Sequence, residues 1–81
     1  MRRAEACSPI VNQYWGDWAA SPLQLNTPSF GACCDECNIR PNCTRFTYWP
    51  GQILNCRLFA TYGSSLFGLT GPVSYQSKWF R

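Results

Sequence analysis

Histidine is missing from this sequence, and acidic residues are scarce. A chain without histidine lacks the commonest general acid–base group. Asp35 and Glu36 adjoin each other on the polar side of a predicted helix, which disfavours the separated carboxylate pair of a glycosidase. Asp17 follows Gly16 and is interpreted as a turn residue. With no nucleophile–base pattern either, the sequence predicts a non-catalytic protein without a cofactor. The four acidic residues are Glu5, Asp17, Asp35 and Glu36.

Long apolar runs and clusters of like charge are also missing. No apolar stretch approaches the roughly 20 residues of a transmembrane helix, so membrane insertion is not expected. The seven basic residues are dispersed, which argues against a nucleic-acid groove and against a polybasic membrane patch. No apolar segment follows the N-terminal MRRAEA. We therefore expect residues 1–6 to be disordered or introduced by expression.

Cysteine and aromatic residues, by contrast, are abundant. The chain has six cysteines among 81 residues, and a domain of this size usually needs help to be stable. An even cysteine count in so short a chain is typical of disulfide-rich proteins from oxidising compartments. We therefore expect one secreted, extracellular domain. Four Trp, four Tyr and five Phe supply more aromatic surface than such a core can bury.

Four of the cysteines fall in the segment ACCDECNIRPNCT, residues 32–44. A zinc site is disfavoured, because two thiols would remain and the adjacent Cys33 and Cys34 suit one tetrahedron poorly. Cys34 and Cys37 have the C-x-x-C spacing of dithiol oxidoreductases, but the βαβ context is missing and the acidic residues between them would raise a thiol pKa. The segment therefore predicts structural disulfides and no metal.

One helix is predicted over about residues 28–38. Thr27 is the expected N-cap, with Pro28 in the first turn. Pro41 disfavours helical geometry at the residue before it, so the helix should end near Asn38. At 100° per residue, one aromatic ring and three cysteines share a single arc, and the buried helix face should therefore be rich in sulfur. These residues are Phe30, Cys33, Cys34 and Cys37.

Two alternating segments predict an antiparallel hairpin. They are CTRFTYW at 43–49 and ILNCRLFA at 53–60, separated by a PGQ turn. A first strand is expected around 10–14 and a last one within GPVSYQSKWF, after a Gly/Ser-rich loop. Phe46, Tyr48, Cys56 and Leu58 should face the helix, whereas Arg45, Thr47, Trp49, Arg57 and Phe59 should face outward.

Six cysteines allow fifteen pairings, and the predicted elements narrow the choice. Cys37 ends the helix and Cys43 lies just past a five-residue turn, so the two can meet. Cys56 faces the helix from the second hairpin strand, where Cys33 is well placed to reach it. The two remaining cysteines form the third pair. The predicted bridges are Cys37–Cys43, Cys33–Cys56 and Cys7–Cys34.

The cysteine spacing resembles that of the PAN/apple family. Its C-x3-C-x5-C-x2-F-T-Y pattern reads CDECNIRPNCTRFTY after Cys33, and C-x-L follows as CRL at 56–58. YWGDW and GPVSYQS resemble the family's first and last strand regions, so a PAN/apple domain is expected over 7–77, with a tail at 78–81. The resemblance implies an α+β fold in which a curved antiparallel sheet cradles one helix, with Cys33–Cys56 and Cys37–Cys43 tying the two together.

One departure from the family concerns the first cysteine. Apple domains of blood proteases join it to a cysteine near the C-terminus, which this chain lacks. The doublet Cys33-Cys34 is instead similar to PAN modules of secreted microbial lectins, such as cellulose-binding elicitor lectins of plant pathogens, and of parasite adhesins. Cys7–Cys34 is inferred as the replacement bridge, and the partner sites of the blood proteases are not carried over.

The resemblance implies a non-catalytic binding module, either monomeric or part of a multi-module chain. The first hypothesis is recognition of carbohydrate, such as a cell-wall polysaccharide, because flat rings stack on the apolar faces of sugars. The second is a protein-binding module of a secreted adhesin or effector, since exposed Trp and Arg suit an interface hot spot. The third is a purely structural domain, or an elicitor that a host receptor recognises.

The candidate ligand contacts lie on the expected outer face of the hairpin and in loops near it. Asn42 begins the glycosylation sequon Asn-Cys-Thr and is a second kind of candidate site, although the middle cysteine and Pro41 argue against efficient modification. The candidate contacts are Trp49, Arg45, Thr47, Arg57, Phe59, Trp15, Trp18 and Tyr62.

Overall fold

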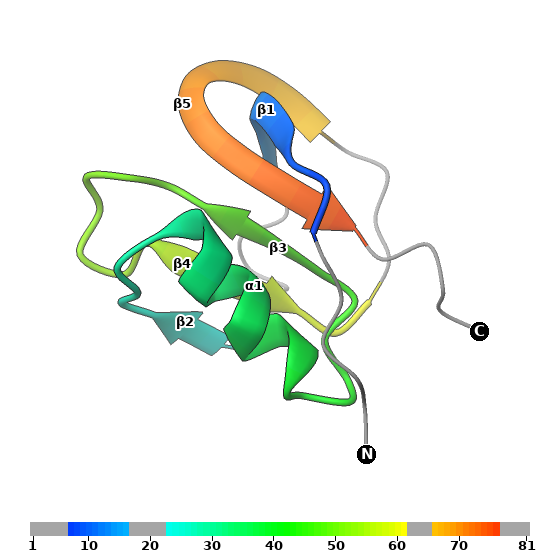
Figure 1. The fold of residues 1–81 in the computed structure, drawn as a ribbon. Helices are drawn as coiled ribbons and strands as arrows, with labels where there is room; N and C mark the ends of the chain where they lie inside the picture. Colours follow the sequence, from blue (N-terminus) through cyan, green and yellow to red (C-terminus); the bar gives the residue numbers. More distant parts are fainter. Residues whose placement is uncertain (1–6, 17–22, 62–65, 77–81) are drawn as a thin grey trace.

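The computed structural model describes residues 7–16, 23–61 and 66–76. One helix packs against a five-stranded antiparallel sheet in the order β1-β5-β3-β4-β2 (Figure 1). Together with three disulfides, this confirms a small disulfide-rich α+β fold. The elements are β1 (Ile10–Trp15), β2 (Leu23–Leu25), α1 (Phe30–Asn38), β3 (Arg45–Tyr48), β4 (Cys56–Phe59) and β5 (Leu66–Gln76).

Helix α1 ends where the sequence predicts but begins two residues later. Ser29 is the N-cap, and its hydroxyl accepts a hydrogen bond from the Ala32 N–H at 3.1 Å. The predicted N-cap, Thr27, is wrong because Asn55 occupies its polar groups. The Thr27 N–H donates to Asn55 Oδ1 at 2.8 Å, and the Asn55 amide donates to the Thr27 carbonyl at 2.8 Å.

The core lies between α1 and the sheet and is rich in sulfur. Cys33 and Cys56 are fully buried, and Phe46 packs between Phe30 and Tyr75, with ring centroids 5.2 and 5.6 Å apart. From this position the adjacent Cys33 and Cys34 reach the sheet and the N-terminal segment respectively. The disulfides confirm all three predicted pairs, Cys7–Cys34, Cys33–Cys56 and Cys37–Cys43.

Strands β3 and β4 form the predicted hairpin. Phe46 lies opposite Leu58 on the helix side, and Thr47 lies opposite Arg57 on the outer side. Strand β2 adds to the far edge of β4, where Gln24 lies opposite Arg57. Strand β2 was not expected from the sequence, because its three residues are too few to show a two-residue alternation.

Strand β5 is longer and more sharply bent than predicted. It begins at Leu66, in the segment interpreted as a Gly/Ser loop, and it curls back on itself in Figure 1. The pairing register with β1 shifts at Asn12, whose φ is 58° and whose Oδ1 accepts a hydrogen bond from the Gly71 N–H at 3.2 Å. Gly71 has a φ of 121°, a conformation that favours glycine. The bend lets β1 and the first half of β5 leave the plane of the sheet.

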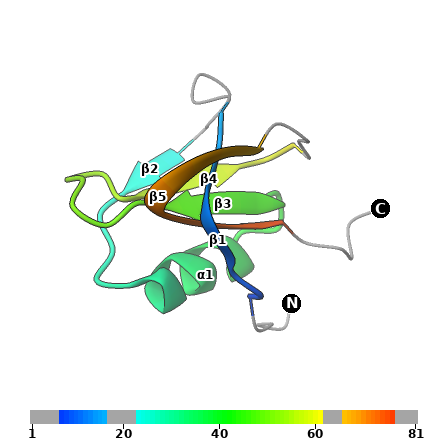
Figure 2. The same ribbon diagram turned by 90° about the horizontal axis from the view of Figure 1, so that it is seen from above.

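Strand β1 therefore connects the two faces of the sheet. Its start is tied to α1 by the Cys7–Cys34 bridge. Its end crosses β3 on the outer side (Figure 2), where the Trp15 N–H donates to the Thr47 hydroxyl at 3.2 Å. The outer face is consequently covered over part of its area.

Candidate functional site

The central part of the outer face is buried, and Arg45 lies inside it. The Arg45 Cζ atom lies 4.7 Å from the ring centroid of Trp15 and 4.2 Å from that of Phe59. Its Nε donates to the Thr61 carbonyl at 2.5 Å. All three side chains of this stack are buried, so the expectation that Trp15, Arg45 and Phe59 are exposed to a ligand is wrong. The reason is the crossing of β1, which places Trp15 over the face.

Thr47 is also buried, contrary to expectation. Its hydroxyl accepts from the Trp15 N–H and lies 2.8 Å from the Ser74 hydroxyl. Ser74 Oγ donates to the Gln13 carbonyl at 2.9 Å, which leaves Thr47 as the donor between the two hydroxyls. The Trp15 indole N–H donates to the Tyr75 carbonyl at 3.3 Å. These hydrogen bonds fasten β1 over the sheet and give Thr47 a structural role.

Beside this covered region, three aromatic rings meet at the surface. Tyr14 lies between the other two, with its ring centroid 5.2 Å from Trp49 and 5.7 Å from Phe67. Tyr14 and Trp49 are half-buried, and Phe67 is 50% exposed. We call Tyr14, Trp49 and Phe67 the aromatic cluster. It contains one predicted candidate, Trp49, and two residues that the sequence analysis missed.

Local sequence explains why two members of the cluster were missed. Tyr14 is next to Trp15, and only the observed register shows that Trp15 faces inward. Phe67 lies in the segment interpreted as a loop, although the run SLFGL could have signalled a strand. Gly16 is what allows the Phe67 ring its position, because a Cβ atom on Gly16 would lie 2.6 Å from a ring carbon. The cluster therefore depends on a strand pairing that sequence alone did not reveal.

Two polar side chains, those of Arg57 and Gln24, lie on the outer face of β4 and β2. Arg57 lies opposite Thr47 on one side and Gln24 on the other, so its side chain shares the outer face of the sheet with theirs. It is half-buried, and desolvation lowers the pKa of its guanidinium from the ordinary value. Its Nε lies 3.5 Å from the Leu54 carbonyl. Gln24 is exposed, so the outer face of β4 and β2 offers a cation and an amide.

The remaining candidates lie elsewhere. Trp18 and Tyr62 are outside the described residues. Asn42 is exposed in the turn after α1, whereas Thr44 of the same sequon is buried and its hydroxyl donates to the Phe59 carbonyl at 3.3 Å. Cys43, between them, is bridged to Cys37. Glycosylation of Asn42 stays a prediction.

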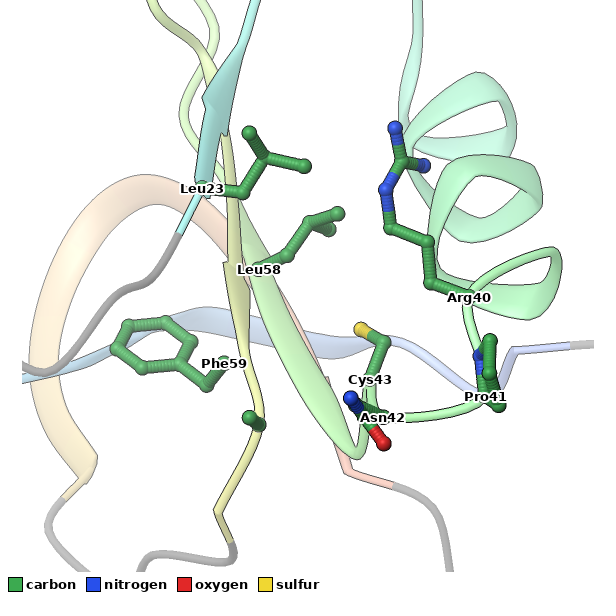
Figure 3. A pocket seen from close by; sticks show the side chains of 8 residues that line it. Leu23, Arg40, Pro41, Asn42, Cys43, Leu58 and Phe59 are labelled. Atoms are coloured by element: carbon green, nitrogen blue, oxygen red, sulfur yellow. The ribbon is translucent and has the colours of Figure 1, made fainter.

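A separate pocket of about 290 Å³ opens on the helix side of the sheet (Figure 3). Its walls are mostly apolar, and Arg40 at its edge donates from Nη1 to Glu36 Oε1 and to the Glu36 carbonyl, both at 2.7 Å. Such a lining has few groups for sugar hydroxyls and suits a small apolar group better. The lining residues are Leu23, Arg40, Pro41, Asn42, Cys43, Leu58, Phe59 and Ala60.

The described residues contain neither a metal-ligating group nor a membrane-spanning helix. That part of the chain holds no group of three or more Cys, His, Asp or Glu side chains arranged for a metal ion. Within the same residues, no helix is long and apolar enough to cross a membrane. All six cysteines are in disulfides.

No protein-family model matches this chain, and no curated protein or solved structure gives a significant match.

Proposed function

We propose that this protein is a secreted, non-catalytic PAN/apple module that binds carbohydrate through the aromatic cluster. The observation that carries the proposal is the contact of the Tyr14 ring with the rings of Trp49 and Phe67 in one partly exposed cluster. Aromatic faces bury the CH groups of a sugar, while guanidinium and amide groups donate to its hydroxyls. Phe67 is 50% exposed, so part of its ring is accessible to a ligand.

The family assignment is supported by the arrangement of the bridges. Cys33–Cys56 joins α1 to β4, and Cys37–Cys43 joins the end of α1 to the approach to β3. This is the pattern that the resemblance implies for a helix cradled by a curved sheet. A secreted location is supported by three disulfides in a domain of 81 residues, since such domains are typical of oxidising compartments.

The test compares wild-type protein with Trp49→Ala and Phe67→Ala on a glycan array and on insoluble polysaccharides. Each substitution should weaken binding by about tenfold or more, the equivalent of about 1.4 kcal/mol per lost stacking contact. Ile39→Ala is the matched control, because Ile39 is 69% exposed but lies at the end of α1, on the other side of the sheet. Failure of wild-type protein to bind any glycan would refute the proposal.

A specific observation favours a protein partner as the second candidate. Ile53 is 83% exposed and Leu54 is 44% exposed on the β3–β4 loop. Hydrogen bonds order this loop, from Asn26 Nδ2 to the Ile53 carbonyl at 2.5 Å and from the Trp49 N–H to the Asn55 carbonyl at 2.7 Å. Ordered, exposed aliphatic side chains suit a protein interface better than a sugar site.

The two candidates differ in their response to free sugar. Millimolar saccharide should displace a carbohydrate from the aromatic cluster, whereas a protein interface should be unaffected. Ile53→Ala should weaken protein binding and leave glycan binding unchanged. Capture of a purified extracellular protein that resists saccharide and requires Ile53 would favour the second candidate.

A further inference from the structure

The rings of the aromatic cluster do not share a plane. The Tyr14 ring is tilted by 38° from Trp49 and stands at 89° to Phe67. A flat ligand face that lies parallel to the Tyr14 ring is therefore tilted relative to the Trp49 ring and perpendicular to the Phe67 ring. The cluster is a corner made of differently oriented faces.

Backbone pairing between strands brings the three rings of this corner together. Tyr14 and Phe67 are opposite each other in the β1–β5 ladder. Trp49 directly follows β3, and its N–H donates to the Asn55 carbonyl at 2.7 Å. The Phe67 ring lies close over Gly16. Two paired strands and the residue that follows β3 therefore fix the backbone positions from which the three rings meet.

Spacing limits the number of sugars that the corner can hold. The centroid distances of 5.2 and 5.7 Å are those of rings in direct contact. Rings that touch form one continuous patch, whereas successive sugars of a chain each need a separate face. The geometry thus offers one stacking place with a second ring against its side.

We propose that the cluster binds one sugar ring at a time, on soluble or amorphous polysaccharide, and does not bind the flat face of a crystalline polysaccharide. This inference rests on the proposed carbohydrate-binding function and specifies its ligand. A crystalline face presents many sugars in one plane, and only coplanar rings can contact several of them together. A freely accessible sugar, at a chain end, a branch or a hydrated chain, can enter a corner and contact two faces.

The first experiment measures retention of the intact, disulfide-bonded protein on crystalline and amorphous forms of the same polymers, cellulose and chitin, alongside a soluble glycan array. We expect binding to soluble or amorphous glycan and at least about tenfold less binding per unit of accessible surface on the crystalline forms. Equal or stronger retention on a crystalline form would overturn this inference and leave carbohydrate binding intact. Binding to no glycan in any form would overturn the proposed function itself.

The second experiment uses the soluble glycan that binds best and varies its length from one to six sugars. A single stacking place predicts that Kd falls by less than about tenfold over this series, as expected from the larger number of equivalent rings. A fall of a hundredfold or more would show several subsites and overturn the inference. Phe67→Ala should weaken binding of the monosaccharide and of the hexasaccharide by the same factor, with Ile39→Ala as the unchanged control.

Discussion

The buried stack of Arg45 between Trp15 and Phe59 yields the sharpest prediction about stability. The perturbation is Arg45→Met, which keeps an unbranched side chain between the rings and removes the guanidinium. The wild-type Cζ atom lies 4.7 and 4.2 Å from the two ring centroids. The side chain is fully buried, and its Nε donates to the Thr61 carbonyl. The substitution therefore removes the cation–π contacts with Trp15 and Phe59 and the charged hydrogen bond to Thr61.

The magnitude follows from these contacts and one opposing effect. A desolvated cation–π contact contributes about 2 kcal/mol, and a hydrogen bond to a charged group contributes roughly 1.5–3 kcal/mol. Burying a cation costs several kcal/mol, and methionine avoids that cost. The net loss in the free energy of unfolding should be roughly 2–4 kcal/mol. The stability of Arg45→Lys should fall between those of wild type and Arg45→Met, because an ammonium keeps the charge but cannot stack as a planar guanidinium does.

The assay is urea denaturation with the disulfides intact, followed by circular dichroism. Arg57→Met is the matched control, because Arg57 occupies the same face of the neighbouring strand but is only half-buried. Its loss should be below about 1 kcal/mol, as for most surface substitutions. Equal losses for the two variants, or an Arg45→Met protein as stable as wild type, would refute the reasoning. Folded Arg45→Met protein should also keep its glycan binding, because Arg45 is not at the surface.

Three further predictions concern the framework around the site. Replacing both Cys33 and Cys56 with Ala should lower the free energy of unfolding by roughly 3 kcal/mol, because the bridge closes a separation of 23 residues; an unchanged denaturation midpoint would contradict this. Gly16→Ala should displace the Phe67 ring and weaken glycan binding in calorimetry, while far-UV circular dichroism stays unchanged. Asn12→Ala should cost about 1–2 kcal/mol, since alanine at a φ of 58° is strained and a hydrogen bond is lost. Asn12→Gly should cost less, and the reverse order would count against a backbone role.

The small area of the aromatic cluster limits the affinity expected of a single domain. One stacking corner on an 81-residue domain offers little area, so a single copy should bind weakly. Linked copies or a ligand with many equivalent sugars would raise the apparent affinity without any new contact.

The pocket of about 290 Å³ opens on the helix side of the sheet, whereas the aromatic cluster is formed by β1, β5 and the residue after β3. Substitutions that fill the pocket should therefore leave glycan binding unchanged.

Local patterns in the sequence determined much of the framework. Helical spacing placed three cysteines on one face of α1, and two-residue alternation placed Cys56 on the opposing strand. Together these positions were enough for all three bridges. Such patterns work because the periods of helix and strand are set by the backbone and show directly in neighbouring residues. The end of α1 near Pro41 followed from equally local geometry.

Tertiary structure alone decided which outward-facing residues stay exposed. Alternation correctly separated Arg45 and Thr47 from the helix side, but it could not show that β1 would cover them. That cover depends on contacts between distant parts of the chain, such as the hydrogen bond from the Trp15 indole to the Tyr75 carbonyl, 60 residues away. It also requires the bend that Asn12 and Gly71 allow. A face is exposed or buried according to what packs on it from elsewhere, and a local pattern carries no information about that.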